Sequence, residues 1–265
     1  MTAHRLRVTA LAAAATTLAI APAATATANA AKAKVKPLRV LVSNDDGVKA
    51  PGIDALVQGL RKLPKVKVTV VAPASQQSGT GGKTTPGTLK ASRTTTASGY
   101  PAIAVDGFPA DSVNYALTKV VKPSQVDLVI AGINQGANLG PFVNLSGTVG
   151  AARAAATRGL PALATSEGTP TVTNFGDGVT ATLQWVKGNR AKLKRGTVQN
   201  LNIPECSAGH FRGIVTATST ATVPTGVNPF VAVDCDQTTP AGSDEVTDFL
   251  AGFATLTKIP LSPAA

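Results

Sequence analysis

The sequence predicts an α/β protein built on a doubly wound, mostly parallel sheet. Near-continuous apolar runs of strand length, such as residues 38–43 (LRVLVS) and 126–134 (VDLVIAGIN), indicate strands that are buried on both faces. Helical segments alternate with these runs, which is the pattern of βαβ units. Ligands of such sheets bind outside the carboxyl ends of the strands. Polar clusters follow the predicted strands, so we expect the functional site at that edge.

The first elements are predicted by hydrophobic spacing and by turn residues. Apolar residues recur at i, i+3, i+4 and i+7 from Ile53 to Leu60, and Pro51 precedes them, which predicts an amphipathic helix. Residues 66–73 (VKVTVVAP) predict a second strand, and the Gly- and Ser-rich residues 74–88 predict a long loop. The next expected elements are a strand at 100–107, a helix at 109–121, a strand at 126–134, a helix at 146–159 and a strand at 160–166.

The last third of the chain gives a weaker pattern. A helix is expected at 179–188, where the only tryptophan lies, and strands are expected at 198–204, 213–220 and 230–235. Residues 205–245 are expected to form an irregular, β-rich extension, either a hairpin or an arm. Cys206 and Cys235 are an even pair, which in an exported protein suggests one disulfide, with two free buried thiols as the alternative.

The first thirty residues are expected to be a secretory signal peptide. Arg5 and Arg7 precede an apolar stretch that ends in the small residues Ala28, Asn29 and Ala30. The alternative, an uncleaved membrane anchor, is less favoured because the apolar stretch is shorter than the about 20 residues that a spanning helix needs. We therefore expect cleavage after Ala30, a secreted protein, a basic linker over 31–37 and a single domain over 38–265.

The chain is strongly basic, with 25 Lys and Arg residues against 14 Asp and Glu residues and a formal net charge of +11. This charge would attract anionic substrates or cell-wall polymers, or it serves solubility alone. Aromatic residues make up only 4% of the chain, so we expect no nucleic acid polymer as a partner. The basic residues 187–196 are interpreted as a solvated helix end and loop.

Asp45 and Asp46 follow the first strand directly. Adjacent aspartates either cap the following turn or, because their charges repel, require a neutralising cation. Ser78 lies in the loop after the second strand and Asn134 ends a third strand. Such an all-oxygen set suits Mg²⁺, Mn²⁺ or Ca²⁺ and does not suit zinc. The sequence therefore predicts one divalent metal ion, held by Asp45, Asp46, Ser78 and Asn134.

A helix start and a Gly-rich loop suggest a place for phosphate. Backbone N–H groups in SGTVG, residues 146–150, lie at the start of a predicted helix and suit phosphate oxygens. An ordinary helix start and a tight glycine turn are the alternatives. The residues predicted to bind substrate phosphate are Asn44, Asn138, Ser146, Gly147 and Thr148.

Five motifs, in this order, resemble the SurE family of 5′/3′-nucleotidases, also called survival-protein phosphatases. They are VSNDDGVKAPGIDAL, VVAPASQQSG, GFPADSVNYAL, DLVIAGINQGANLG and SGTVGAARAAATRGLPALATS, and they extend over about residues 38–166. The resemblance implies a Rossmann-like fold with a C-terminal extension that is used in oligomers, here a homodimer or a homotetramer. It places Asp45, Asp46, Ser78 and Asn134 on the metal-binding positions of the family, and Asp111 on a further motif position.

The function predicted from these residues is metal-dependent hydrolysis of phosphomonoesters. The resemblance implies nucleoside 5′-monophosphates, and also 3′-monophosphates, as small-molecule substrates. Asp45 or Asp46 would act as the catalytic residue that orients water and accepts its proton. Two alternatives remain open, namely a secreted, non-catalytic binding protein for anions or nucleotides on the same fold, and a phosphatase for other phosphoesters.

Overall fold

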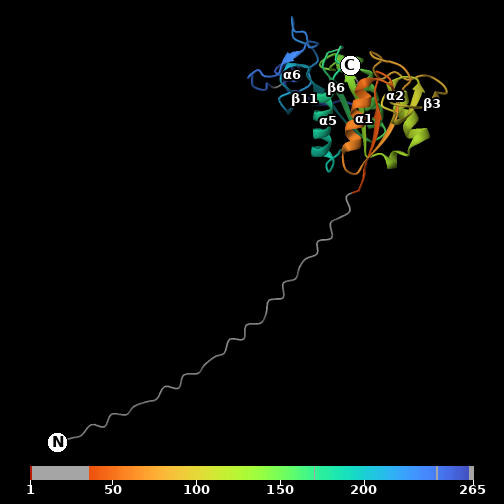
Figure 1. Ribbon diagram of the computed structural model, residues 1–265, viewed down its shortest axis with the longest axis horizontal. Helices are drawn as coiled ribbons and strands as arrows, with labels where there is room; N and C mark the ends of the chain where they lie inside the picture. The colour runs from red at the N-terminus through yellow and green to blue at the C-terminus, as the bar shows by residue number, and fades with distance from the viewer. Residues whose placement is uncertain (2–35, 170, 243, 263–265) are drawn as a thin grey trace. The chain divides into compact units, whose positions relative to one another are not determined.

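A mostly parallel sheet organises the chain, as Figure 1 shows. The computed structural model describes Met1 and residues 36–169, 171–242 and 244–262. The predicted signal peptide and most of the predicted linker therefore lie outside the described residues. Within the described part, nine strands form one sheet in the order β3-β4-β2-β1-β5-β6-β7-β11-β9. The prediction of an α/β, Rossmann-like fold is confirmed.

The strand bounds agree with the predicted apolar runs in the first two thirds of the chain. The strands of the large sheet are β1 (Leu38–Ser43), β2 (Val66–Pro73), β3 (Lys90–Thr95), β4 (Pro101–Asp106), β5 (Leu128–Gln135), β6 (Pro161–Glu167), β7 (Thr197–Ile203), β9 (Ile214–Thr216) and β11 (Ala254–Ile259). Only β3 against β4 and β11 against β7 are antiparallel.

The strand order reverses between β1 and β5. Strands β2 and β4 lie on one side of β1, and strands β5, β6 and β7 lie on its other side. In the register of this pair, Val40 lies opposite Leu128 and Ser43 lies opposite Ala131. The carboxyl ends of β1 and β5 therefore meet at a topological switch point, which is where ligands bind in open α/β sheets. Asp45 follows β1 and Asn134 lies near the end of β5, so the fold brings both to this point.

Helices cover both faces of the sheet. The helices are α1 (Pro51–Lys62), α2 (Pro109–Tyr115), α3 (Phe142–Leu145), α4 (Gly147–Thr157), α5 (Gly176–Asn189) and α6 (Glu245–Leu250). Helices α1 and α5 pack beside each other on one face, seen in front of the sheet in Figure 1, and α2 and α4 pack together on the other. Ile53 and Leu60 of α1 share one apolar core with Trp185 of α5. Val113 and Val149 belong to a second core.

Several elements differ from the prediction, and α6 and β11 lie in a segment for which the sequence predicted no element. Strand β3 forms after the long loop, where no strand was predicted because the polar sequence KASRTT shows no apolar alternation. This strand pairs only with β4. The helix expected over 109–121 changes after Tyr115 into a π-helical turn, Ala116–Val120. The strand expected over 230–235 is reduced to β10 (Val233–Asp234).

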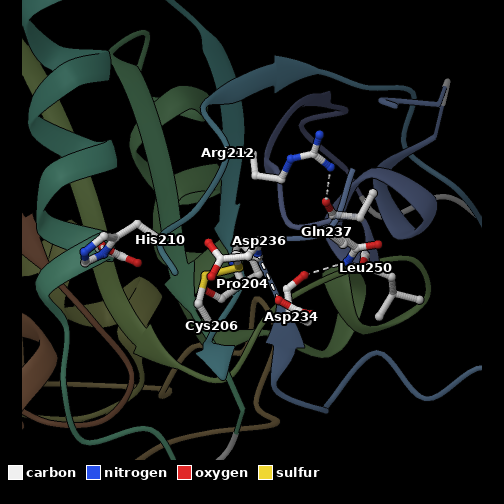
Figure 2. The surroundings of a disulfide bond; sticks show 11 residues. Pro204, Cys206, His210, Arg212, Asp234, Asp236, Gln237 and Leu250 are labelled. Atoms are coloured by element: carbon white, nitrogen blue, oxygen red, sulfur yellow. Dashed lines mark hydrogen bonds and ion pairs between the residues drawn. A yellow bond between two sulfur atoms is a disulfide. The ribbon is translucent and has the colours of Figure 1, made fainter. Parts of the chain in front are cut away.

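The C-terminal extension is held together by a short strand pair and a disulfide bond, and a hydrogen bond joins it to α6. Strand β10 pairs in parallel with β8 (Cys206–Ala208), so this part of the chain does not form a hairpin. A disulfide bond joins Cys206 to Cys235, and Figure 2 shows it between the two short strands. Just beyond it, Gln237 Nε2 donates to the carbonyl oxygen of Leu250 at 2.9 Å, which connects the extension to α6.

We predict that Cys206 and Cys235 are bridged in the purified protein and that the bridge stabilises the fold. The two positions are 29 residues apart, and closing a loop of that size should contribute about 3.6 kcal/mol by restricting the unfolded chain. The double variant Cys206→Ser, Cys235→Ser should lose that amount in denaturant unfolding. Two free thiols in denatured, unreduced wild-type protein would contradict the prediction.

Candidate functional site

Asp45 is buried at the switch point and is held by the start of α4. Asp45 is only 2% exposed. The Thr148 N–H donates to Asp45 Oδ2 at 3.0 Å, and the Thr148 hydroxyl donates to Asp45 Oδ1. Burial raises the pKa of Asp45, and the Thr148 hydrogen bonds oppose that shift. The carboxylate is thus fixed in orientation but its negative charge is poorly solvated.

Asp46 is partly exposed beside Asp45. Its Oδ2 accepts a hydrogen bond from the backbone N–H of Gln135 at 3.0 Å, across the gap between β1 and β5. Burial, with the neighbouring charge of Asp45, raises the pKa of Asp46 to about 7. In the ion pairs of the described residues, neither aspartate has a lysine or arginine partner. The negative charge of the pair is therefore not compensated by a basic side chain in these ion pairs.

Two asparagines near the carboxyl ends of β1 and β5 have buried side-chain oxygens without a partner among the described residues. Asn134 is 7% exposed, and its Nδ2 donates to the carbonyl oxygen of Gly136 at 2.6 Å. Asn44 Nδ2 donates in the same way to the carbonyl oxygen of Gly47 at 2.8 Å. Each hydrogen bond fixes the amide, and the Oδ1 atoms of Asn44 and Asn134 have no hydrogen-bond partner among the described residues. A buried acceptor without a donor is costly unless a ligand satisfies it.

Ser78 lies on the exposed loop after β2, and backbone contacts bring that loop to the site. The N–H of the preceding residue, Gln77, donates to the carbonyl oxygen of Asp45 at 2.6 Å. Further along, the Gly81 N–H donates to the carbonyl oxygen of Leu145 at 2.9 Å, just before α4. The loop is therefore pinned at both the end of β1 and the start of α4, with Ser78 between the two contacts.

The four predicted metal positions all carry oxygen donors. Asp45, Asp46 and Asn134 offer carboxylate and amide oxygens, and Ser78 adds a hydroxyl from the pinned loop. Among the residues that the structure describes, no group of three His, Cys, Asp or Glu side chains is arranged to hold a metal. Hard oxygen donors with two negative charges fit Mg²⁺, Mn²⁺ or Ca²⁺, and the unpartnered Asn134 oxygen supports this fit.

The predicted phosphate residues take different places in the structure. Ser146 is the N-cap of α4, where its Oγ accepts from the Val149 N–H at 3.2 Å, and Gly147 is buried against Asp45. Both donors of Thr148 are directed at Asp45, so in this arrangement Thr148 orients the carboxylate. The N-terminal turn of α4 thus contributes to the site chiefly by holding Asp45.

Asn138 belongs to a buried polar network that the sequence did not predict. Its Nδ2 donates to Ser166 Oγ at 2.8 Å, and its backbone N–H donates to Asn202 Oδ1 at 2.7 Å. Asn200 and Asn202 each donate to the Asn138 carbonyl oxygen. The network fixes the Gly-rich loop after β5 onto β6 and β7. Polar residues at alternate positions of β7 were the available signal, although they are unusual in a central strand.

Asp111 has a supporting place in this structure. Its Oδ2 accepts from the Phe108 N–H at 2.9 Å and from the Thr85 hydroxyl at 2.7 Å. The side chain is 3% exposed. Asp111 thus joins the start of α2 to the far end of the loop that carries Ser78.

Glu167, which ends β6, is a second residue that the sequence analysis missed. It is 3% exposed, and burial raises its pKa to about 8, with the nearby backbone N–H of Gly178 opposing the shift. Its Oε2 has no hydrogen-bond partner among the described residues. The preceding residues, 160–166, predict a buried strand, and nothing in that pattern distinguishes a buried glutamate from an exposed one after the strand.

Comparison with known proteins gives the class to which this fold and site belong. The family model described as "Survival protein SurE" matches residues 40–224. The crystal structure of the SurE protein from Aquifex aeolicus superposes with a TM-score of 0.68 at 28% identity, covering 85% of this chain and 94% of that one.

Relatives at higher identity carry the same family name. The protein named 5′-nucleotidase SurE from Desulfatibacillum aliphaticivorans is 38% identical over 181 residues, which is 67% of this chain and 70% of that protein. Its namesake from Pelobacter propionicus is 37% identical over 209 residues, which is 77% of this chain and 79% of that protein. The chain belongs to the SurE family, which confirms the resemblance. None of the described helices has the length and hydropathy to cross a membrane.

We predict that Gly150→Ala destabilises the protein although alanine favours helices. A Cβ at position 150 would lie 2.0 Å from the carbonyl oxygen of Gly81, so the loop carrying Ser78 must move away from α4. We expect a loss of about 1–3 kcal/mol, measured by thermal or denaturant unfolding. Gly188→Ala in α5 is the matched control, since its Cβ meets nothing within 4 Å, and it should stabilise by up to about 1 kcal/mol. Equal stability of the two variants would contradict the packing.

We predict that Glu167 makes the protein less stable as pH rises. Its pKa is about 8 in the fold against an ordinary value of 4.5, so the folded state retains the proton over a range in which the unfolded state loses it. The stability is full below about 4.5 and falls as the pH approaches about 8. One pKa unit corresponds to about 1.4 kcal/mol, so the fall should amount to a few kcal/mol. Glu167→Gln should flatten this slope in denaturant unfolding, and an unchanged slope would show that Glu167 is not buried as described.

Proposed function

We propose that this chain is a metal-dependent phosphomonoesterase that hydrolyses nucleoside 5′-monophosphates, with 3′-monophosphates as a second substrate class. The observation that carries the proposal is the pair Asp45 and Asp46 beside the unpartnered oxygen of Asn134 at the switch point. The name 5′-nucleotidase borne by relatives at 37–38% identity supports the nucleotide as substrate. One Mg²⁺, Mn²⁺ or Ca²⁺ ion would be held by Asp45, Asp46, Asn134 and Ser78.

A bound divalent cation supplies charge stabilisation at a phosphate oxygen and lowers the pKa of a nearby water. The protein's own part is to hold the acceptor groups rigidly and to move a proton. Asp45 is fixed by Thr148 and serves as a positioned negative charge. Asp46 is the more exposed of the two and keeps one oxygen free of the Gln135 hydrogen bond, so we assign it the role of orienting water and accepting its proton.

We also propose that the protein acts outside the cell. The leader pattern of residues 1–30 supports secretion, and the Cys206–Cys235 bond is of the kind that persists in oxidising compartments. A basic chain outside the cell would meet anionic nucleotides with favourable electrostatics. Assembly into a homodimer or a homotetramer remains a prediction of the family resemblance.

We predict that Asp45→Asn abolishes phosphate release from nucleoside 5′-monophosphates while the chain stays folded. Asparagine keeps the shape of the side chain but removes its charge. Mutating a residue that only orients a metal ligand lowers activity about 10- to 100-fold, so we expect the loss of a ligand to lower the rate of phosphate release at least about a hundredfold. Phosphate release with Mn²⁺ present measures it.

Asp106→Asn is the control for this variant, because Asp106 is an exposed aspartate that likewise ends a strand of the sheet. It should retain wild-type activity. Wild-type turnover in Asp45→Asn would reject the site. A folded wild-type protein that binds Mn²⁺ and nucleotide without releasing phosphate would favour the non-catalytic alternative.

A further inference from the structure

A cavity of about 450 Å³ opens beside the candidate site, at the carboxyl ends of β6 and β7 and the start of α5. Residues from all three elements line it, including Glu167, Glu205 and Asp177. Neither the metal positions nor the predicted phosphate residues lie in it. It is therefore a separate chamber on the edge of the sheet where ligands of this fold class bind.

The cavity is acidic, in contrast to the chain as a whole. Glu167, Asp177 and Glu205 contribute carboxylates, and the described residues that line the cavity include no lysine or arginine. His210, at the rim, lies with its Nδ1 3.1 Å from Asp177 Oδ1. A concave site of this charge in a protein of net charge +11 favours ligand groups that carry N–H donors.

Glu167 distinguishes this cavity from an ordinary acidic surface. The carboxylate of Glu205 is already satisfied, because its Oε2 accepts from the Thr169 N–H at 3.2 Å and from the Thr169 hydroxyl at 2.7 Å. Glu167 is nine-tenths buried or more, and its Oε2 has no such partner. A Cβ at position 178 would lie 2.2 Å from this oxygen, so any residue other than glycine there would clash with the Glu167 carboxyl group. A buried acceptor at a cavity wall is the arrangement that a ligand donor satisfies.

Gln135 connects the cavity to the candidate site. Its backbone N–H donates to Asp46, and its Nε2 donates to the carbonyl oxygen of Val172, a cavity residue, at 2.8 Å. In the sheet, Gln135 lies opposite Glu167. Neighbouring strands are about 5 Å apart, so the cavity begins one strand away from Asn134. A ribose bridges a comparable span between the phosphate and the base of a nucleotide.

We propose that this cavity receives the base of the nucleotide and favours bases with an exocyclic amino group, with Glu167 as the residue that determines this specificity. The inference rests on the proposed function and adds to it the class of nucleotide. Cytosine and adenine present an amino group that donates to a carboxyl oxygen. Uracil presents a carbonyl oxygen at the corresponding position, and once Glu167 is ionised, above its pKa of about 8, that oxygen would face a carboxylate that only accepts hydrogen bonds and would leave Glu167 unsatisfied.

The test compares cytidine and uridine 5′-monophosphates, which differ in the amino or oxo group at one ring position. At a pH above the Glu167 pKa of about 8, wild-type protein with Mn²⁺ should hydrolyse the cytidine substrate with a kcat/KM at least about tenfold higher, since a buried acceptor left unpaired costs about 1–3 kcal/mol. Glu167→Gln, whose amide both donates and accepts, should reduce this ratio mainly by raising the KM for the cytidine substrate. Asp106→Asn should leave the ratio unchanged.

Different failures separate the two proposals. Equal hydrolysis of both substrates, or an unchanged ratio in Glu167→Gln, would reject the base cavity and leave the nucleotidase in place. If no nucleotide is hydrolysed, the nucleosides cytidine and uridine are compared by calorimetric binding to the folded wild-type protein. Tighter binding of cytidine would then keep the cavity while the nucleotidase is rejected, and equal binding or no binding would reject the cavity as well.

Discussion

The adjacent carboxylates of buried Asp45 and half-buried Asp46 are the constraint on which the rest of the site depends. Burial raises the pKa of both carboxyls, and the charge of Asp45 raises the pKa of Asp46 further. Thr148 and the backbone of Gln135 provide hydrogen bonds, but no basic side chain pairs with the aspartates among the described ion pairs. This missing compensation is the observation on which the proposed divalent cation rests.

The two-sided packing of the sheet holds this pair in place. The first turn of helix α4 contacts Asp45 through Thr148. The position of α4 is fixed by the second apolar core, to which its residue Val149 belongs. On the opposite face, α1 begins directly after the aspartates and packs against β5 and α5. The loop with Ser78 is joined to β1 by Gln77 and to α2 by Asp111. Each component of the site is therefore carried by a rigid element or tied to one.

The sequence allowed the places of Asp45, Asp46 and Asn134 in the fold to be predicted, because each lies at the end of an apolar run whose burial is plain, and parallel strands bring their carboxyl ends together. It did not allow β3 to be predicted, since KASRTT has no apolar alternation and its pairing with β4 is tertiary. The Asn200–Asn202 network and Glu167 were missed for a related reason. A polar residue in or after a strand gives no sign of burial until the neighbouring strands and helices are placed around it.

The most direct test of the account is the anomalous diffraction of a crystal of this protein soaked in Mn²⁺. The account predicts one manganese peak at the carboxyl ends of β1 and β5, within coordination distance, about 2–2.5 Å, of oxygens from Asp45, Asp46 and Asn134. A peak there would show that the paired carboxylates form a metal centre. No peak there at saturating Mn²⁺, with both aspartates ordered, would contradict the central claim and leave the carboxylates as caps of the turn that follows β1.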